Sequence, residues 1–222
     1  MRHFTRTAGL LACLMALLAG TPGRAAAQGG YFGTNKVQYR DFRFQVLATD
    51  HFDVYFYPEE EAAARLASRM AERWYERLSR LLGHELRGRQ PLILYASAPH
   101  FRQTNAIEGE LGEGTGGVTE AAKRRIVLPF AGPLESTDHV LGHELVHAFQ
   151  YDMTNTNASS GANSALSLPL WFVEGMAEYL SLGPVDAHTA MWMRAAAERD
   201  RLPEIKALDN PRYFPYRYGH AV

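Results

Sequence analysis

The chain has 222 residues, with 23 Lys and Arg against 24 Asp and Glu, so its formal net charge at pH 7 is −1. Hydrophobic residues make up 46% of the sequence and charged residues 21%, proportions that are typical of soluble globular proteins and that exclude a disordered chain. The sequence contains no internal repeat and no heptad pattern, which excludes a solenoid or a coiled coil.

Residues 1–27 have the pattern of a secretory signal peptide. Arg2 and Arg6 make its start positive, residues 10–19 form an apolar run too short to cross a bilayer as a helix, and the alanines at 25–27 provide a cleavage site. We therefore expect an exported protein, periplasmic or extracellular, without stable membrane insertion after cleavage. A retained membrane anchor is the alternative, and the shortness of the apolar run argues against it.

Cleavage would leave residues 28–222 as one domain with 20 basic and 24 acidic residues. This balance gives no electrostatic reason to expect nucleic acid as a partner. Cys13 is the only cysteine and lies in the signal peptide, so the mature domain has no disulfide, no thiol nucleophile and no thiolate metal ligand. Its stability must come from a hydrophobic core, to which a bound metal can add.

The first half of the domain is predicted to contain strands on either side of one long helix. Alternating apolar and polar residues predict strands at 42–46 and 52–57. A helix is predicted from Pro58 to about Leu82, because acids fill its first turn and Gly83 follows it. Its apolar positions recur at helical spacing and form a stripe that we interpret as core: Leu66, Met70, Trp74, Leu78 and Leu81.

Three more strands are predicted before the second long helix. An apolar run at 91–96 indicates a buried strand, and residues 117–119 and 125–128 are predicted to form a hairpin. A hairpin directly before a helix would place a sheet edge beside that helix. This edge is either ordinary sheet structure or a surface on which an extended peptide docks, and the sequence does not separate the two.

The second half of the domain is predicted to be mainly helical. Ser136 or Thr137 can cap a helix over residues 138–151. The polar stretch at 154–168 is predicted to be a loop. A second helix is predicted over residues 170–182, because a proline precedes it and a glycine follows it.

The first of these helices contains the pattern His-Glu-x-x-His at residues 143–147. Residues four apart on a helix share a face, so His143 and His147 can bind one metal ion, at Zn–N distances of about 2.0–2.1 Å. Glu144 flanks the metal without binding it and can take a proton from water, as a general base does. A chance match is the alternative, because only three positions of the pattern are fixed.

The helix over residues 170–182 carries two acids, Glu174 and Glu178, on one face of an otherwise apolar segment. Acids are rarely buried without a partner. A catalytic zinc ion takes three protein ligands and keeps one position open, and Glu174 fits as the third ligand. Glu178, one turn later, is suited to accept the ring N–H of a ligating histidine. Together the two helices predict one Zn²⁺ per chain.

Residues 143–147 and the segment Glu-Gly-x-Ala-Glu-Tyr at 174–179 together resemble the gluzincin branch of the zincin metallopeptidases, which includes the thermolysin and aminopeptidase N families. The resemblance implies an α+β, zincin-like fold. In that fold a mixed, mainly antiparallel sheet packs on the long helix and on the His-Glu-x-x-His helix, and a helical segment with the glutamate ligand follows. It also implies zinc-dependent hydrolysis of internal bonds in a peptide or protein substrate. It assigns Glu174 as ligand and Glu178 as the group that orients a histidine.

The chain as a whole resembles bacterial exported proteins in which a peptidase-like N-terminal domain precedes β-propeller repeats. This resemblance covers nearly all of residues 31–222 and implies that a C-terminal β-propeller follows in the full-length protein, so that the catalytic domain is truncated at its C-terminal end. The segments that carry it are 103–105, 116–120, 143–150, 168–179 and 216–220.

The sequence departs from these families in its spacing and near its end. The spacer of 26 residues between His147 and Glu174 is longer than in the two familiar families. The amine-binding pattern of the aminopeptidases, Gly-x-Met-Glu-Asn, is absent, so their exopeptidase specificity is not carried over. Gluzincins use a later Tyr or His to stabilise the oxyanion, and we assign Tyr218 or His220 to this role. The residues available for it are Tyr213, Tyr216, Tyr218 and His220.

Two other functions remain open from the sequence. A non-catalytic zinc-binding or protein-interaction module on a peptidase scaffold would not need the base Glu144, whose presence argues against it. A purely structural metal is disfavoured because three protein ligands leave one position open. His139 lies one turn before His143, and we interpret it as a solvated residue of the first turn, as we interpret His84 as a surface residue.

Overall fold

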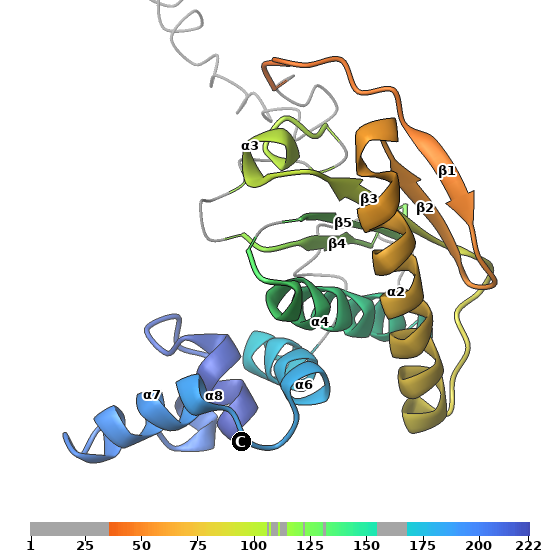
Figure 1. Ribbon diagram of the computed structural model, residues 1–222. Coiled ribbons are helices and arrows are strands. Elements are labelled where there is room, and N and C mark those ends of the chain that lie inside the picture. Colours follow the sequence, from red (N-terminus) through yellow and green to blue (C-terminus); the bar gives the residue numbers. More distant parts are fainter. Residues whose placement is uncertain are drawn as a thin grey trace, which may run out of the picture. The chain divides into compact units, whose positions relative to one another are not determined.

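The structure is a computed structural model of the 222-residue chain, and it describes residues 36–105, 107, 111, 115–121, 123–130, 132–154 and 168–222. The signal peptide predicted at 1–27 and most of the loop predicted at 154–168 lie outside these residues. The described part is α+β: a mixed five-stranded sheet and six α-helices, with the C-terminal helices beside the sheet domain (Figure 1).

The strands occur in the sheet in the order β1-β2-β3-β5-β4. The pairs β1–β2 and β4–β5 are antiparallel, whereas β2–β3 and β3–β5 are parallel. The expectation of a mainly antiparallel sheet is therefore wrong. One long helix lies between β2 and β3, and β4, which is antiparallel to β5, lies between β3 and β5, so β3 and β5 start from the same end of the sheet as β2. The strands are β1 (Gln45–Ala48), β2 (Phe52–Phe56), β3 (Gln90–Tyr95), β4 (Val118–Glu120) and β5 (Arg125–Pro129).

The two faces of the sheet pack on different elements. Leu92 and Leu94 of β3 belong to the main core with α2 (Glu61–Leu82) and α4 (Leu134–Met153), whereas Ile93 and Tyr95 pack on the opposite face with Phe101 of α3 (Ala98–Phe101). This follows from the alternation of side chains along a strand. The hairpin β4–β5 is confirmed, and its strand β4 forms one edge of the sheet beside α4.

The long helix was predicted correctly except at its first turn and at one apolar position. Residues Pro58–Glu60 form a 3-10 turn, α2 follows, and Gly83 ends it in the left-handed conformation with φ 60°. Met70, Trp74 and Leu78 are buried, but Leu81 is 57% exposed and does not belong to the core. It lies in the last turn of α2, where its neighbour Leu82 packs against the core instead.

Two other predicted boundaries are wrong. The first strand begins at Gln45, because Phe42 and Phe44 pack instead against Tyr57 and Tyr95 on the far face of the sheet. Helix α4 begins four residues before the predicted start. The carbonyl of Pro133 accepts hydrogen bonds from the N–H groups of residues 136 and 137, so both residues lie inside the first turn and neither side chain caps it.

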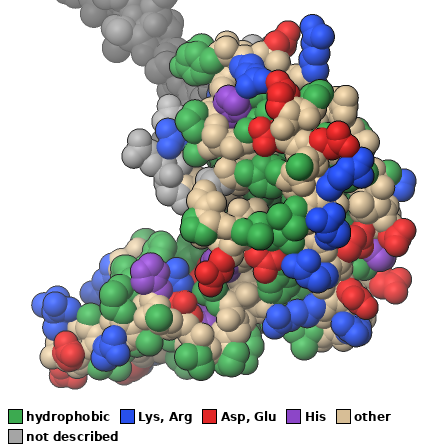
Figure 2. All heavy atoms as spheres, viewed as in Figure 1, with side chains coloured by type: hydrophobic (Ala, Val, Ile, Leu, Met, Phe, Trp, Pro, Cys, Tyr) green, Lys and Arg blue, Asp and Glu red, His purple; other side chains and the backbone are tan. Residues whose placement is uncertain are grey.

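The C-terminal part consists of α6 (Leu170–Leu182), which has the predicted bounds, α7 (Ala187–Ala197), a 3-10 turn (Ile205–Ala207) and α8 (Pro215–Ala221). Helix α8 packs on α6, and α6 packs on α4. Large hydrophobic side chains are exposed on these helices, as the lower left of Figure 2 shows; Tyr179 and Trp192 are two of them. No helix in the described ranges has both the length and the apolar character that a membrane span needs.

An ionic cluster around one buried carboxylate joins α4 to the hairpin and to the segment after α2. The carboxylate of Asp152 is fully buried and contacts Arg124 at 2.7 Å, His84 at 2.8 Å and Arg87 at 3.2 Å. His84, which was expected to be a surface residue, has a side chain that is 30% exposed, and its ring also contacts this carboxylate, which comes from a helix 68 residues later. The cluster anchors the C-terminal end of α4, the helix that carries the predicted site.

Candidate metal centre

Helices α4 and α6 bring the three predicted ligands together. Nε2 of His143 and Nε2 of His147 are 3.1 Å apart, and Oε2 of Glu174 lies 3.3 Å from each of them. The two histidines are one turn apart on α4, and Glu174 projects from α6 across the contact between the two helices. The three atoms therefore form a nearly equilateral triangle.

The triangle has the dimensions of one face of a zinc tetrahedron. Ligand atoms about 2.0–2.1 Å from zinc at tetrahedral angles are about 3.3–3.4 Å apart. Oε2 of Glu174 is buried and forms no hydrogen bond within the described residues, although an unpartnered buried carboxylate oxygen is costly. Two imidazoles and a carboxylate are also the donor set that zinc prefers. The residues present therefore fit a zinc ion.

The carboxylates around the triangle favour a positive charge there, and without a metal this charge is the proton on His143. Burial raises the pKa of Glu174, but its contacts with His143 and His147 outweigh this and lower the pKa to about 2. Burial lowers the pKa of His143, but contacts with Glu174 and Glu178 outweigh this and raise the pKa to about 10. The carboxylates thus stabilise positive charge at the position between the three ligand atoms.

The other ring nitrogen of each histidine lies next to a polar side chain, although that of His143 is buried without a hydrogen bond of full geometry. Nδ1 of His143 lies 3.1 Å from Oε1 of Glu178, and Nδ1 of His147 donates to Oε1 of Gln150 at 2.8 Å. Gln150 also donates to the carbonyl of Val173, the residue before Glu174, at 3.1 Å. Such partners fix the orientation of a metal-binding imidazole. Gln150 was missed because only its position three residues after His147 pointed to it.

Glu178 is held in turn by residues that come later in the chain. Nη1 of Arg217, on α8, donates to Oε2 of Glu178 at 2.9 Å and to Oδ2 of Asp186 at 3.4 Å. Burial raises the pKa of Glu178, but its contacts with His139 and His143 lower that pKa far below the usual range. Glu178 therefore stays ionised and can accept the N–H of His143.

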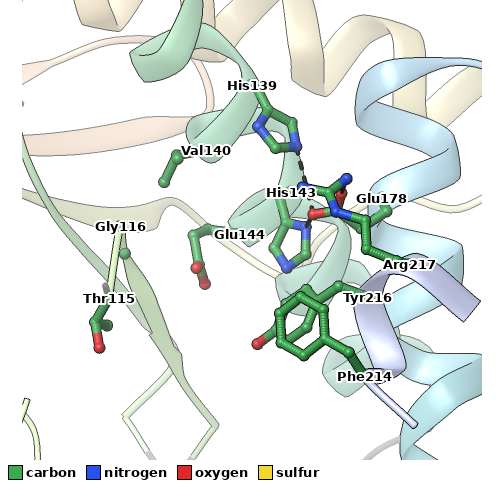
Figure 3. A pocket seen from close by; sticks show the side chains of 11 residues that line it. Thr115, Gly116, His139, Val140, His143, Glu144, Glu178, Phe214, Tyr216 and Arg217 are labelled. Atoms are coloured by element: carbon green, nitrogen blue, oxygen red, sulfur yellow. Dashed lines mark hydrogen bonds and ion pairs between the residues drawn. The ribbon is translucent and has the colours of Figure 1, made fainter. Parts of the chain in front are cut away.

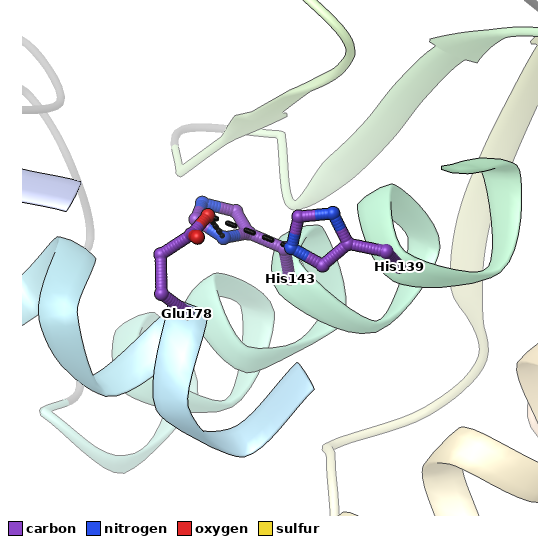
Figure 4. A group of neighbouring side chains, drawn as sticks. All are labelled: His139, His143 and Glu178. Carbon is purple, nitrogen blue, oxygen red and sulfur yellow. Dashed lines mark ion pairs between the residues drawn. The ribbon is translucent and has the colours of Figure 1, made fainter. Parts of the chain in front are cut away.

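His139 takes part in this group, contrary to the expectation of a solvated residue. Its Nε2 is buried and lies 3.5 Å from Oε1 of Glu178, the oxygen that also faces His143 (Figure 4). His139, His143 and Glu178 form a second group with ligand atoms close together, and it shares His143 with the first. Arg217 beside Glu178 places a positive charge there, so the first group is the better cation site.

A cavity of 490 Å³ opens on the His143 side of the triangle. Its walls come from the segment before β4, from α4, α6 and α8, and Figure 3 shows Glu144 and Tyr216 projecting into it from opposite sides. The ring of Tyr216 stacks on that of His143, with centroids 5.7 Å apart. Burial and the carboxylates of Glu174 and Glu144 raise the pKa of Tyr216 above its usual range, so its hydroxyl keeps its proton.

The structure does not bring Tyr218 or His220 to this cavity. The ring of Tyr218 packs against Trp192, on the other side of α8. His220 is buried, and its two ring nitrogens are bonded to the hydroxyl of Thr189 and the carbonyl of Gly183. Both assignments fail for the same reason: α8 begins at Pro215, so its helical phase turns Tyr216 toward the metal centre. Pro215, at the first position of α8, is the sequence signal that marks this start.

Glu144 lies beside the triangle, between α4 and the edge strand β4. Its Oε2 accepts a hydrogen bond of 2.7 Å from the hydroxyl of Thr119.

Comparison of the chain with protein-family models, with curated proteins and with solved structures finds no match. The support for a function therefore comes from the geometry of the described residues.

Proposed function

We propose that this chain is a zinc-dependent peptidase of the gluzincin type that hydrolyses internal bonds of peptide or protein substrates. The observation that carries the proposal is the triangle of His143 Nε2, His147 Nε2 and Glu174 Oε2, with sides of 3.1–3.3 Å, next to a carboxylate that binds none of these atoms. The sequence pattern of residues 1–27 supports export to the periplasm or the cell exterior.

His143, His147 and Glu174 would hold the zinc ion. When bound, zinc supplies Lewis-acid polarisation of a carbonyl group and makes water more acidic. Glu144 then takes a proton from the attacking water and returns it to the nitrogen of the leaving amine, the two proton transfers that peptide hydrolysis needs. Glu144 suits this role because it lines the cavity without contacting the three ligand atoms.

Tyr216 is our candidate for oxyanion stabilisation. Its phenol lies over His143, next to the cavity, and keeps its proton at neutral pH. A hydroxyl placed in this way can donate a hydrogen bond to the oxygen that becomes negatively charged when the carbonyl is attacked. Tyr216 thus takes the role that was expected of Tyr218 or His220.

The test is hydrolysis of a quenched fluorescent peptide library by the zinc-loaded chain. We expect cleavage that a chelator abolishes and added zinc restores. Glu144→Gln should retain zinc and lower kcat by about 10²–10⁴-fold, because an amide keeps the shape of the side chain but cannot accept the proton. Glu135→Gln, an exposed acid in the first turn of the same helix, is the matched control and should leave kcat unchanged.

The opposite result would favour the other candidate function. If the chain binds zinc but cleaves no peptide in the library, and Glu144→Gln alters no measured property, the peptidase proposal is wrong. The chain would then be a non-catalytic zinc-binding or protein-interaction module on the same scaffold.

A further inference from the structure

The edge strand β4 makes two contacts with Glu144 that the peptidase mechanism leaves unexplained. Thr119, in the middle of β4, is buried, and its hydroxyl lies 2.7 Å from Oε2 of Glu144 and 2.8 Å from the backbone oxygen of the same residue. Thr119 pairs with Ile126 of β5, so the sheet fixes its backbone. The hydroxyl is therefore held at a constant position relative to α4.

The carboxylate is the better acceptor of the two. A threonine hydroxyl has one proton to donate. Hydrogen bonds to ionised groups are roughly twice as strong as those between neutral groups. The backbone oxygen of Glu144, in addition, lies within α4, where helical N–H groups supply its hydrogen bond. The hydroxyl of Thr119 thus donates its hydrogen bond to Oε2 of Glu144.

Gly117 lies two residues before Thr119 and, by the alternation of a strand, on the same side. A Cβ atom added to Gly117 would lie 3.0 Å from Cγ of Glu144, 3.2 Å from its Oε1 and 2.9 Å from a methyl group of Val140. The missing side chain therefore provides the space that the carboxyl group of Glu144 occupies. Thr119 therefore binds Oε2 of Glu144, and Gly117 leaves space for Oε1.

We propose that Thr119 is a positioning residue for the general base, and that it fixes the carboxylate of Glu144 through Oε2 so that Oε1 remains available for proton transfer. Among the described residues, Oε1 of Glu144 forms no hydrogen bond to the protein. This inference rests on the proposed function. Proton transfer needs the donor and acceptor atoms within about 2.6–3.2 Å, and a glutamate side chain without a partner would sample several rotamers.

The test uses the full chain loaded with zinc, and the variants Thr119→Val and Thr119→Ser. Valine keeps the shape of threonine but removes the hydroxyl, so kcat should fall by about 10–100-fold while KM stays the same. Zinc affinity should not change, because Thr119 contacts none of the three ligands. Serine keeps the hydroxyl and should restore kcat to within about threefold of the original value. Thr137→Val, a buried threonine at the start of α4, is the matched control and should keep kcat.

A second measurement, the binding of an inhibitor, does not depend on peptide hydrolysis. A peptide hydroxamate chelates zinc and shares a proton with the carboxylate beside it, so its dissociation constant reports on the position of Glu144. We expect Thr119→Val to weaken hydroxamate binding by about 10-fold or more and Thr119→Ser to preserve it. If Thr119→Val does not fold, Thr119→Ala provides the same test, because it also removes the hydroxyl that contacts Oε2 of Glu144.

The inference is overturned if Thr119→Val keeps both kcat and hydroxamate affinity, or lowers only the melting temperature. Either result would mean that the hydroxyl serves the backbone of α4. If the unmodified chain binds zinc and hydroxamate but hydrolyses no peptide, the proposed function fails, while the hydroxamate measurement still decides the role of Thr119.

Discussion

Gly219 of α8 packs directly on Gly175 of α6, and neither position has room for a side chain. A Cβ atom on Gly219 would lie 1.9 Å from the carbonyl oxygen of Trp171 and 2.8 Å from Cα of Gly175. This contact sets the distance between the two helices. It therefore also determines how close Tyr216 and Arg217 come to the metal centre.

Gly219→Ala should accordingly displace α8. We expect the free energy of unfolding to fall by about 1–3 kcal/mol, as in other overpacked contacts, and kcat to fall with it because Tyr216 moves. Chemical denaturation and peptide hydrolysis measure the two effects. Gly88→Ala is the control: Gly88 has φ 73° and no atom within 4 Å of an added Cβ, so the substitution should cost about 1 kcal/mol of backbone strain and leave kcat unchanged.

Tyr216→Phe tests the oxyanion role. Removal of one oxyanion donor costs on the order of 100–1,000-fold in kcat, and zinc content should not change because the phenol is not one of the three ligands. Tyr218→Phe makes the same chemical change two residues later, on a side chain that packs against Trp192. It should leave kcat within about threefold of the original value; a larger loss for Tyr218→Phe than for Tyr216→Phe would reverse the assignment.

Glu178→Ala and Arg217→Met test the chain of contacts behind His143. Loss of a group that orients a metal-binding histidine weakens metal affinity by about 10–100-fold, so Glu178→Ala should have this effect without abolishing binding. Arg217→Met should have a smaller effect in the same direction, because it frees Glu178 to move. Competition with a chelator measures both, with the exposed Arg194→Met as control. If Glu178→Ala is as severe as Glu174→Ala, the two acids share the ligand role.

Asp152→Asn should destabilise the fold without altering the zinc site. Hydrogen bonds to charged groups contribute about 1.5–3 kcal/mol each, so we expect a loss of about 2 kcal/mol at pH 7. Asp53→Asn, which breaks a more exposed pair with Arg89 at 3.3 Å, should cost about 0–1 kcal/mol. Urea denaturation of the three proteins measures the difference.

The effect of Asp152→Asn should depend on pH. Burial raises the pKa of Asp152, but its contacts with His84 and Arg87 and the charge of Arg124 lower the pKa in the folded state. A lowered carboxyl pKa stabilises the fold above the unfolded value of about 3.9, and this contribution is lost as pH falls through the folded pKa. The difference between Asp152 and Asn should thus be full at pH 7 and shrink below about pH 4. A difference that stays constant down to pH 3 would contradict this.

Local sequence signals predicted the parts of the site that lie on single helices. The spacing of His143 and His147 follows from helical periodicity, and the proline and glycine around α6 set its bounds and hence the face on which Glu174 and Glu178 lie. These features need no knowledge of distant contacts. The proposed zinc ligands were thus named from the sequence, although their meeting at one point depends on how α4 and α6 pack.

The remaining parts depend on tertiary contacts that the sequence does not encode locally. Arg217 reaches Glu178 across 39 residues, and Thr119 reaches Glu144 across 25. The parallel pairing of β2, β3 and β5 likewise depends on where the intervening connections return the chain. Tyr216 and Tyr218 are distinguished by the start of α8 at Pro215, because each residue rotates a helical side chain by about 100°.

The position of a bound metal ion decides whether His143, His147 and Glu174 form the proposed zinc site. Diffraction data from crystals of the zinc-loaded chain, recorded on both sides of the zinc absorption edge, locate the ion without reference to activity. We expect one anomalous peak at about 2.0–2.2 Å from Nε2 of His143, Nε2 of His147 and an oxygen of Glu174. A peak between His139, Nδ1 of His143 and Glu178 instead, or no peak at either group, would contradict it.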